Sequence, residues 1–140
     1  MAEISKADVY RRAAEVIVRD GKHEKTFVEG WAPTPTPRPA PAEMETGWPA
    51  LRRAIKDRSR PVCALGACLR AEYELTGTLT FGRSDGDHVY EQYSFDVRAD
   101  SLLPGGAERD IEIWQYNDRD RISAEDIALE LKRRAEEIDG

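Results

Sequence analysis

Residues 60–75, RPVCALGACLRAEYEL, constrain the fold more than any other stretch of the chain. From Val62 to Ala71 almost every residue is apolar, so a helix here has almost no polar face. A helix that is apolar all round is normally buried on all sides. Pro61 suits a first helical position, where its missing N–H is not needed. The sequence therefore predicts a central helix over about 61–75, wrapped by the first and last helices.

Glycines mark the interior and the end of this predicted helix. Gly66 lies inside it, at a cost of roughly 1 kcal/mol relative to alanine, so we expect another backbone to approach closely there. Gly77 follows the last helical residues and is expected to end the helix.

Two outer helices carry clear start signals. Ser5 with Asp8 predicts a capping box and a helix over 6–20, which Gly21 ends. Ser123 with Asp126 predicts a second box and a final helix. Its expected inner stripe consists of Ile127, Ala128, Leu131, Ala135 and Ile138.

The length of 140 residues is typical of one domain, so we expect a single domain over 1–140. A short helix is predicted over about 48–57. The alternation in residues 88–97 predicts a β-hairpin with residues 78–83. A helix competes with it, because Val89, Tyr93 and Val97 are four apart. The fold class is therefore mainly α, with α+β left open through this hairpin.

Residues 29–49 hold six of the eight prolines, mostly in alternating Pro-x order. Such a segment favours an extended conformation and excludes helix. We expect a surface loop whose flanking residues, Trp31 and Trp48, attach it to the body. The same loop is the best candidate in the sequence for a protein-binding surface, although its two-residue proline step departs from PxxP spacing.

Composition excludes several classes of function. A net charge of −6 with interspersed charges argues against nucleic-acid binding. No apolar run approaches the roughly 18 residues of a membrane helix, and the N-terminus does not resemble a signal peptide. With two cysteines, Cys63 and Cys68, a disulfide framework or a four-thiolate zinc site is excluded. We therefore expect a cytoplasmic protein with free thiols.

Cys63 has two interpretations. At a helix N-terminus, the positive end of the dipole can lower a thiol pKa and favour a nucleophile. His88 as the base and Asn117 or Asp118 as the orienting group would follow in the chain order of papain-like enzymes. Against this, cysteine is among the most buried residue types and usually packs as a small hydrophobe.

Polar stretches of the sequence offer candidate ligand sites. NDRDRISAEDI fails as a calcium loop, because Asp120 falls where glycine is required. Asp85, Asp87 and His88 are explained by a turn, so we expect no metal and no cofactor. Asn117 and Asp118 either shape the turn that Trp114 anchors or form a polar recognition site.

Four places in the chain carry a resemblance, namely RRAAEVI at 11–17 in the first helix, CALGA at 63–67, Trp114 with Asn117 and Asp118, and AEDIALEL at 124–131 in the final helix. In these four places the chain resembles an uncharacterised family of small actinobacterial and phage proteins. That family has W-N-D contiguous, whereas Gln115 and Tyr116 intervene here, and the proline segment is particular to this chain. The resemblance implies a mainly helical fold and an actinobacterial or phage source. It implies no reaction.

These observations favour a non-enzymatic accessory module that binds a protein partner, with no role for nucleic acid or membrane. The expected binding residues are Trp31, Trp48, Trp114, Asn117 and Asp118. The alternative is a cysteine-dependent hydrolase or transferase that uses Cys63, His88 and Asn117 or Asp118.

Overall fold

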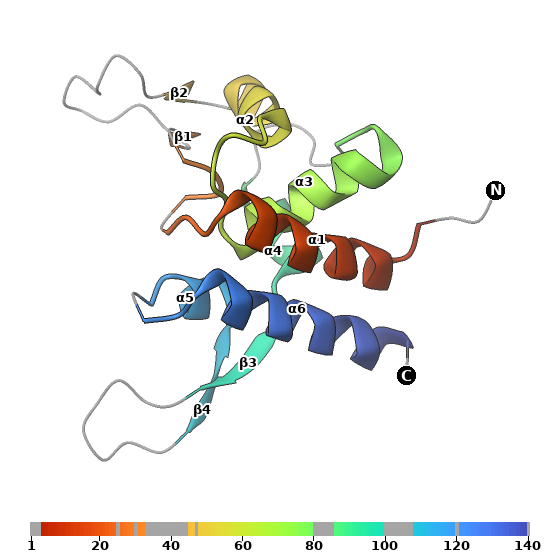
Figure 1. The fold of residues 1–140 in the computed structure, drawn as a ribbon, viewed down its shortest axis with the longest axis vertical. Helices are drawn as coiled ribbons and strands as arrows, with labels where there is room; N and C mark the ends of the chain where they lie inside the picture. Colours follow the sequence, from red (N-terminus) through yellow and green to blue (C-terminus); the bar gives the residue numbers. More distant parts are fainter. Residues whose placement is uncertain are drawn as a thin grey trace.

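A computed structural model of the chain describes residues 4–24, 26–29, 31–32, 45–46, 48–79, 86–99, 108–119 and 121–139, without the side chains of 31–32, 45–46, 48–49, 86–88 and 90. These ranges form six helices, α1 (Lys6–Asp20), α2 (Trp48–Lys56), α3 (Ala64–Thr76), α4 (Gly86–Tyr93), α5 (Ile113–Asn117) and α6 (Ala124–Asp139). They also form two small sheets, with β1 (Trp31–Ala32) parallel to β2 (Glu45–Thr46) and β3 (Asp96–Ala99) antiparallel to β4 (Arg109–Glu112). The expected mainly α fold with a small β part is confirmed (Figure 1). No helix in these ranges is long and apolar enough to cross a membrane.

Both predicted capping boxes are present. The Asp8 N–H donates to Ser5 Oγ and the Ser5 N–H to Asp8 Oδ2, each over 3.1 Å. Asp126 N–H and Ser123 Oγ are 3.1 Å apart, and Ser123 N–H and Asp126 Oδ2 are 2.9 Å apart. These reciprocal bonds satisfy backbone donors that have no partner within the first turn, which is why both helices begin where the sequence predicts.

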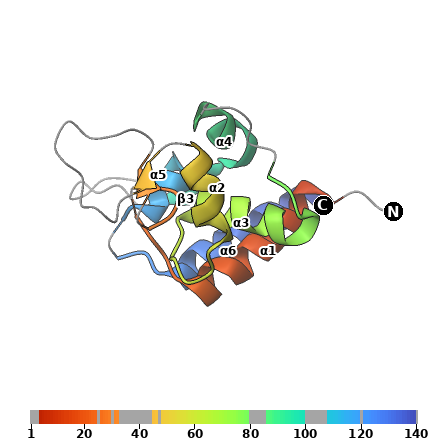
Figure 2. The same cartoon turned by 90° about the horizontal axis from the view of Figure 1, so that it is seen from above.

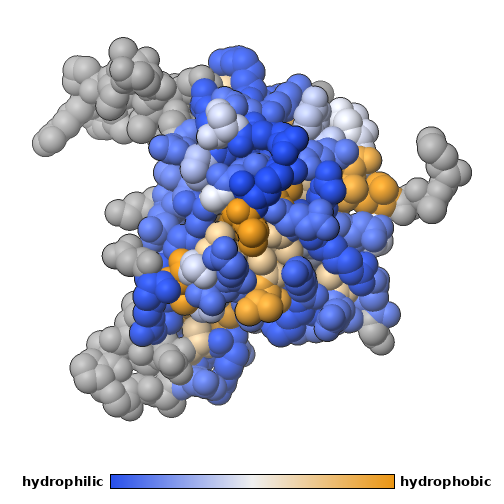
Figure 3. Space-filling model, viewed as in Figure 1, coloured by the Kyte–Doolittle hydropathy of each residue, from blue (hydrophilic) through white to orange (hydrophobic). Residues whose placement is uncertain are grey.

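Helices α1 and α6 lie antiparallel, side by side, with the start of α1 near the end of α6 (Figure 1). An ion pair between Arg11 and Asp139 joins these two ends. The predicted inner stripe of α6 is buried except at Ile138, which is 40% exposed because it lies in the last turn, beyond the packed part of the helix. The outer face of the pair is mostly hydrophilic, with apolar side chains gathered between the helices (Figure 3).

Helix α3 occupies the centre of the domain, and its residues from Ala64 to Glu72 are all buried. Helix α1 packs along it, and α2, α4 and α5 also contact it (Figure 2). The expectation that the last helix wraps α3 is wrong, because α6 packs chiefly along α1. The central helix is thus covered by short elements from the middle of the chain as well as by α1.

Helix α3 starts three residues later than predicted, at Ala64, and Cys63 is its N-cap. The reason is backbone pairing at Val62, which bridges residue 22 on one side and residue 28 on the other. The Val62 N–H donates to the Gly21 carbonyl over 3.0 Å, and the His23 N–H donates to the Val62 carbonyl over 2.9 Å. This extended pairing holds residues 61–63 out of the helix, so Pro61 lies before the N-cap rather than at the first helical position.

The close approach expected at Gly66 is confirmed. A Cβ atom at this position would lie 1.9 Å from the Phe27 carbonyl oxygen, which is far inside van der Waals contact. The same oxygen accepts a hydrogen bond from the Cys63 N–H over 3.1 Å. Gly77 ends α3 in the left-handed conformation, with φ +75°, as predicted. Gly21 has a positive φ of 101° but its ψ of 158° is extended, not left-handed helical.

The predicted hairpin, in which residues 78–83 pair with residues 88–97, is wrong. Residues 86–93 are helical, and the strand that follows, β3, pairs with β4, so that Val97 faces Ile111. The four-residue spacing of Val89 and Tyr93 serves α4, where both side chains are buried. A β-hairpin therefore does stand between the cysteine helix and the Trp114 segment, but its second strand comes from later in the chain.

The proline-rich segment begins and ends in the described part of the chain. Trp31 pairs with Glu45 and Ala32 with Thr46 in the parallel β1–β2 ladder, which brings the two ends of the segment together. Residues 33–44 lie outside the described residues, as do the side chains of Trp31 and Trp48. The prediction that these two tryptophans attach the loop stays a prediction.

Candidate functional site

The Cys63 thiol is buried at the start of α3. Its side chain is 6% exposed, and its Sγ accepts a hydrogen bond from the Gly66 N–H over 3.3 Å. Burial raises the pKa of Cys63 to about 12, and the backbone N–H bonds from Gly66 and Leu65 offset this only in part. Burial also raises the pKa of Cys68 well above its ordinary value. Both thiols are therefore protonated at neutral pH, whereas a nucleophile must be a thiolate.

Asn117 lies beside Cys63, and both ends of its amide bond to backbone groups. Its Oδ1 accepts from the Ala64 N–H over 3.0 Å, and its Nδ2 donates to the His23 carbonyl over 2.9 Å. The side chain is fully buried. Asn117 thus caps the first turn of α3 and ties it to the segment after α1, and the amide is not directed at the thiol.

Among the described side chains, the imidazole in this region belongs to His23, whereas the sequence-based hypothesis used His88. The His23 ring bonds through Nε2 to Thr26 Oγ1, at 2.8 Å, and not to Cys63. Burial lowers its pKa, against the opposing effect of the nearby carboxylates of Glu29 and Asp118. The backbone of His88 lies in α4, but its side chain lies outside the described residues.

Asp118 ends α5 and is half-buried. Its charge contributes to raising the pKa of Cys63, so a thiolate here would be disfavoured by the carboxylate as well as by burial. The structure therefore places Cys63, Asn117 and Asp118 together at the N-terminal end of α3, as the enzyme hypothesis required. It supplies neither an activated thiol nor, among the described side chains, an imidazole that bonds the sulfur.

The second question about this site is whether its side chains could bind a metal ion. The described residues contain no group of three or more His, Cys, Asp or Glu side chains that could hold an ion. Asp85 and the side chains of Asp87 and His88 lie outside that description.

A concave surface opens on the outer side of Asp118. It has a volume of about 630 Å³ and is lined by Arg109, Ile111, Trp114, Gln115, Asp118, Arg119 and Arg121. We call this surface the arginine hollow. Three of its residues carry guanidinium groups and one carries a carboxylate, whereas the chain as a whole has a net charge of −6. Its charge is therefore opposite in sign to that of the molecule.

Separate elements position the residues of the arginine hollow. Arg109 begins β4, where it pairs with Ala99 of β3. Trp114 lies on α5 and packs against the core while it lines the hollow. Arg119 and Arg121 follow α5 in the turn that leads to α6.

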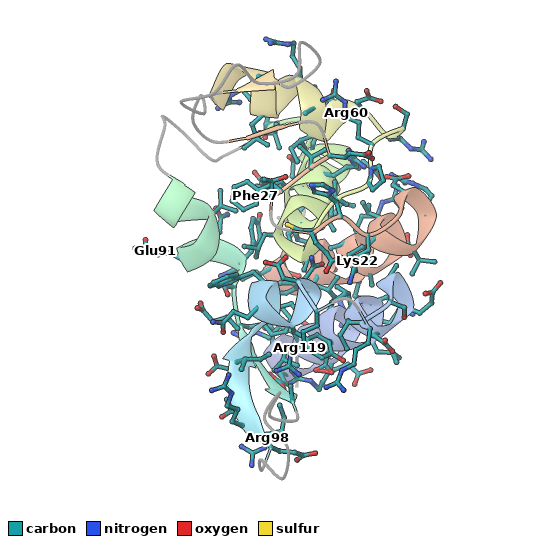
Figure 4. The ribbon with its side chains drawn as sticks, turned by 90° about the vertical axis from the view of Figure 1, so that its left-hand side faces the viewer. Lys22, Phe27, Arg60, Glu91, Arg98 and Arg119 are labelled. Atoms are coloured by element: carbon teal, nitrogen blue, oxygen red, sulfur yellow. The ribbon has the colours of Figure 1, made fainter. Side chains whose placement is uncertain are left out.

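Lys22 holds the turn that carries Arg119. Its ammonium donates to the Arg119 carbonyl over 3.0 Å and to the Ile122 carbonyl over 2.5 Å. The Ile122 N–H also donates to the Arg119 carbonyl, over 3.1 Å. Figure 4 shows Arg119 below α5, between Lys22 and Arg98. A long-range side-chain contact therefore sets the backbone of this turn in addition to its own hydrogen bonds.

A second, smaller hollow of about 250 Å³ adjoins the first, since Arg119 and Arg121 line both. Arg98 also lines it, and this side chain is ion-paired with Glu108 at 3.7 Å and Asp110 at 3.5 Å. The two hollows adjoin each other from α5 to the β3–β4 hairpin, and the excess of positive charge lies in the first, because Glu108 and Asp110 balance Arg98 in the second.

A comparison with known protein families matches residues 1–137 to a family of unknown function, DUF6197. The chain belongs to this family. The match covers nearly the whole of the sequence, so the DUF6197 domain includes all six helices and both sheets described above. No curated protein and no solved structure matches the chain.

Sequence reasoning pointed to some residues of the candidate site and missed the others. Trp114, Asn117 and Asp118 were chosen from one short segment, and the structure places them together. Arg109, Arg119 and Arg121 were missed because they alternate with acidic residues along the chain and look neutral in any window. The signal that could have found Arg109 is the strand period in residues 109–112, because a strand there can pair with the preceding one and form a hairpin.

Proposed function

We propose that this DUF6197 protein is a non-enzymatic accessory module that binds a protein partner through the arginine hollow. The observation that carries this proposal is the contrast between a buried, protonated thiol on one side of Asp118 and an open, charged surface on the other. On one side the Cys63 thiol is buried and protonated, with a pKa of about 12. On the other side Trp114 and the arginines Arg109 and Arg121 line an open surface.

The composition of the arginine hollow supports a binding role. Tryptophan and arginine are enriched among residues that dominate binding energy at protein interfaces. The fully buried amide of Asn117 and the fixed turn at Arg119 supply a rigid frame behind the surface. A surface that is already formed loses little conformational entropy on binding.

The resemblance seen in the sequence supports an actinobacterial or phage source, and the two free cysteines support a place of action in the cytoplasm. The proline-rich segment, with Trp31 and Trp48, remains a predicted second contact for the partner. Deleting residues 33–44 from the chain would reduce partner binding if that contact contributes.

Site-specific photocrosslinking tests the binding role. Benzoylphenylalanine at Arg121, an exposed edge residue of the arginine hollow, is expected to give light-dependent adducts with a defined protein of the host extract. The same probe at Glu136, exposed on α6, is the matched control and is expected to give none. Adducts that excess unlabelled chain removes support the proposal. Equal adducts at both positions, or none at Arg121, contradict it.

A further inference from the structure

We infer that the arginine hollow recognises an acidic segment of the partner, in which carboxylate side chains flank an aromatic residue. This inference rests on the proposed function and specifies the chemistry of the partner. Its starting point is charge: among the described residues that line the arginine hollow, Arg109, Arg119 and Arg121 carry guanidinium groups and Asp118 carries a carboxylate. Arginine binds carboxylates through two parallel N–H···O bonds, which adds geometric specificity to the attraction.

The apolar part of the arginine hollow favours a ligand that carries an apolar group in addition to its negative charges. Trp114 and Ile111 lie among the arginines, and Trp114 is half-buried, so part of its ring faces the open surface. An aromatic side chain of the partner can stack there or meet the ring edge-on. A segment that combines acidic and aromatic residues would satisfy both kinds of surface at once.

The size of the surface favours an extended segment over a single small anion. The volume of about 630 Å³ is within the range that holds a ligand of several groups. The adjoining hollow continues the concave surface past Arg119 and Arg121 to Arg98, which is itself ion-paired with Glu108 and Asp110. Carboxylates spaced along a peptide can meet charges distributed in this way, whereas one small anion would leave most of them unused.

The distribution of charge separates carboxylates from phosphates. A phosphate concentrates nearly two negative charges on one group, whereas the guanidinium groups of the arginine hollow belong to Arg109 in β4 and to Arg119 and Arg121 after α5. A nucleic acid is disfavoured further, since its phosphate backbone would meet a protein of net charge −6. An acidic peptide carries fewer charges than a nucleic-acid backbone, and it can place single carboxylates opposite separate arginines.

Fluorescence anisotropy with the full chain and a fluorescein-labelled peptide tests the inference. The probe has a phenylalanine with two glutamates on each side. The variant Arg109→Gln/Arg121→Gln removes two exposed charges of the arginine hollow and leaves the buried Arg119 in place. We expect its dissociation constant to rise by about tenfold or more, as the loss of two charge-assisted contacts implies.

The matched control is Arg53→Gln/Arg58→Gln, which removes the same charge from exposed positions on and after α2. Its dissociation constant is expected to stay within about twofold of the wild-type value, because distant surface charges are screened. Equal weakening in both double variants would overturn the inference, since net charge alone would then explain binding. Failure of the wild-type chain to bind at about 1 mM peptide would also overturn it.

Two further probes distinguish other ligands. One replaces the glutamates by glycine and the phenylalanine by phosphotyrosine, and the other is a fluorescein-labelled oligothymidylate. Tighter binding of either probe than of the acidic peptide, lost in Arg109→Gln/Arg121→Gln, overturns the choice of a carboxylate ligand. Crosslinks at Arg121 without peptide binding would leave the proposed function standing and reject this inference. Peptide binding without crosslinks would reject the proposed function.

Discussion

Replacing Arg70 by methionine is expected to lower the free energy of unfolding by about 4 kcal/mol, the largest effect of any single substitution considered for this chain. The guanidinium of Arg70 is 1% exposed. It donates to the backbone carbonyls of Ala54, Ile55, Asp57 and Arg60 and to the Asp20 carboxylate, over 2.6–3.2 Å.

The expected cost arises from the acceptors that remain. Methionine fills much of the volume of Arg70 but donates nothing, so the carbonyls of Ile55 and Arg60 lose the guanidinium N–H that satisfies them, whereas Ala54 and Asp57 each keep a backbone N–H donor. Each buried acceptor without a partner costs roughly 1–3 kcal/mol. Asp20 keeps its ion pair with Arg19, at 2.7 Å, which is why we do not add the full cost of an isolated buried charge.

Urea unfolding followed by circular dichroism measures this effect. Arg70→Lys retains the charge but offers fewer donors in a different geometry, so an intermediate loss is expected. Arg53→Met, on the exposed face of α2, is the control and is expected to change stability by less than about 0.5 kcal/mol. A loss below about 1 kcal/mol in Arg70→Met would contradict this role for the guanidinium.

The second large effect is expected for Gly66→Ala, which should destabilise the protein by about 3 kcal/mol. In an ordinary helix interior the same change stabilises by roughly 1 kcal/mol, because alanine has the higher helix propensity. Here the added Cβ would lie 1.9 Å from the Phe27 carbonyl oxygen and 2.9 Å from its carbon. These are backbone atoms, so the whole segment around Phe27 must move away from α3.

Gly77→Ala is the matched control at the other end of α3. No atom lies within 4 Å of a Cβ at this position, so its cost is limited to the left-handed backbone, about 1 kcal/mol. Hydrogen exchange offers a second readout, because displacement of Phe27 releases the Cys63 N–H from its carbonyl. Unchanged or increased stability of Gly66→Ala, with the Cys63 amide still protected, would show that the close approach is not required.

Local signals in the sequence predicted the parts of the fold that local interactions determine. Ser5 and Ser123 start their helices through bonds to residues three positions away, and both starts are correct. The start of α3 was misplaced because Val62 is held by residues 21–28, far away in the chain. The hairpin was misplaced because the spacing of Val89 and Tyr93 fits a strand and a helix equally well.

Several features of the interior and of the candidate site could not be predicted, because they depend on hydrogen-bond and strand partners that lie far apart in the sequence. Arg70 is the one charged residue in the apolar run from Val62 to Ala71, and its acceptors come from four other positions and from Asp20. Asn117 was expected to shape its own turn, and its amide instead joins α3 to His23. The arginine hollow depends on the register of β3 with β4, which no single segment of sequence specifies.

Alkylation of the folded chain with iodoacetamide tests most directly the claim that the start of α3 is a packed support and not a reactive centre. At neutral pH we expect Cys63 and Cys68 to stay unmodified over the time in which the urea-unfolded chain is fully alkylated, as peptide mass spectrometry would show. The thiol introduced by Glu136→Cys, exposed on α6, should react at once in the same folded chain. Rapid, selective alkylation of Cys63 in the native protein would contradict the account, since it requires an accessible thiolate where the structure has a buried thiol with a pKa of about 12.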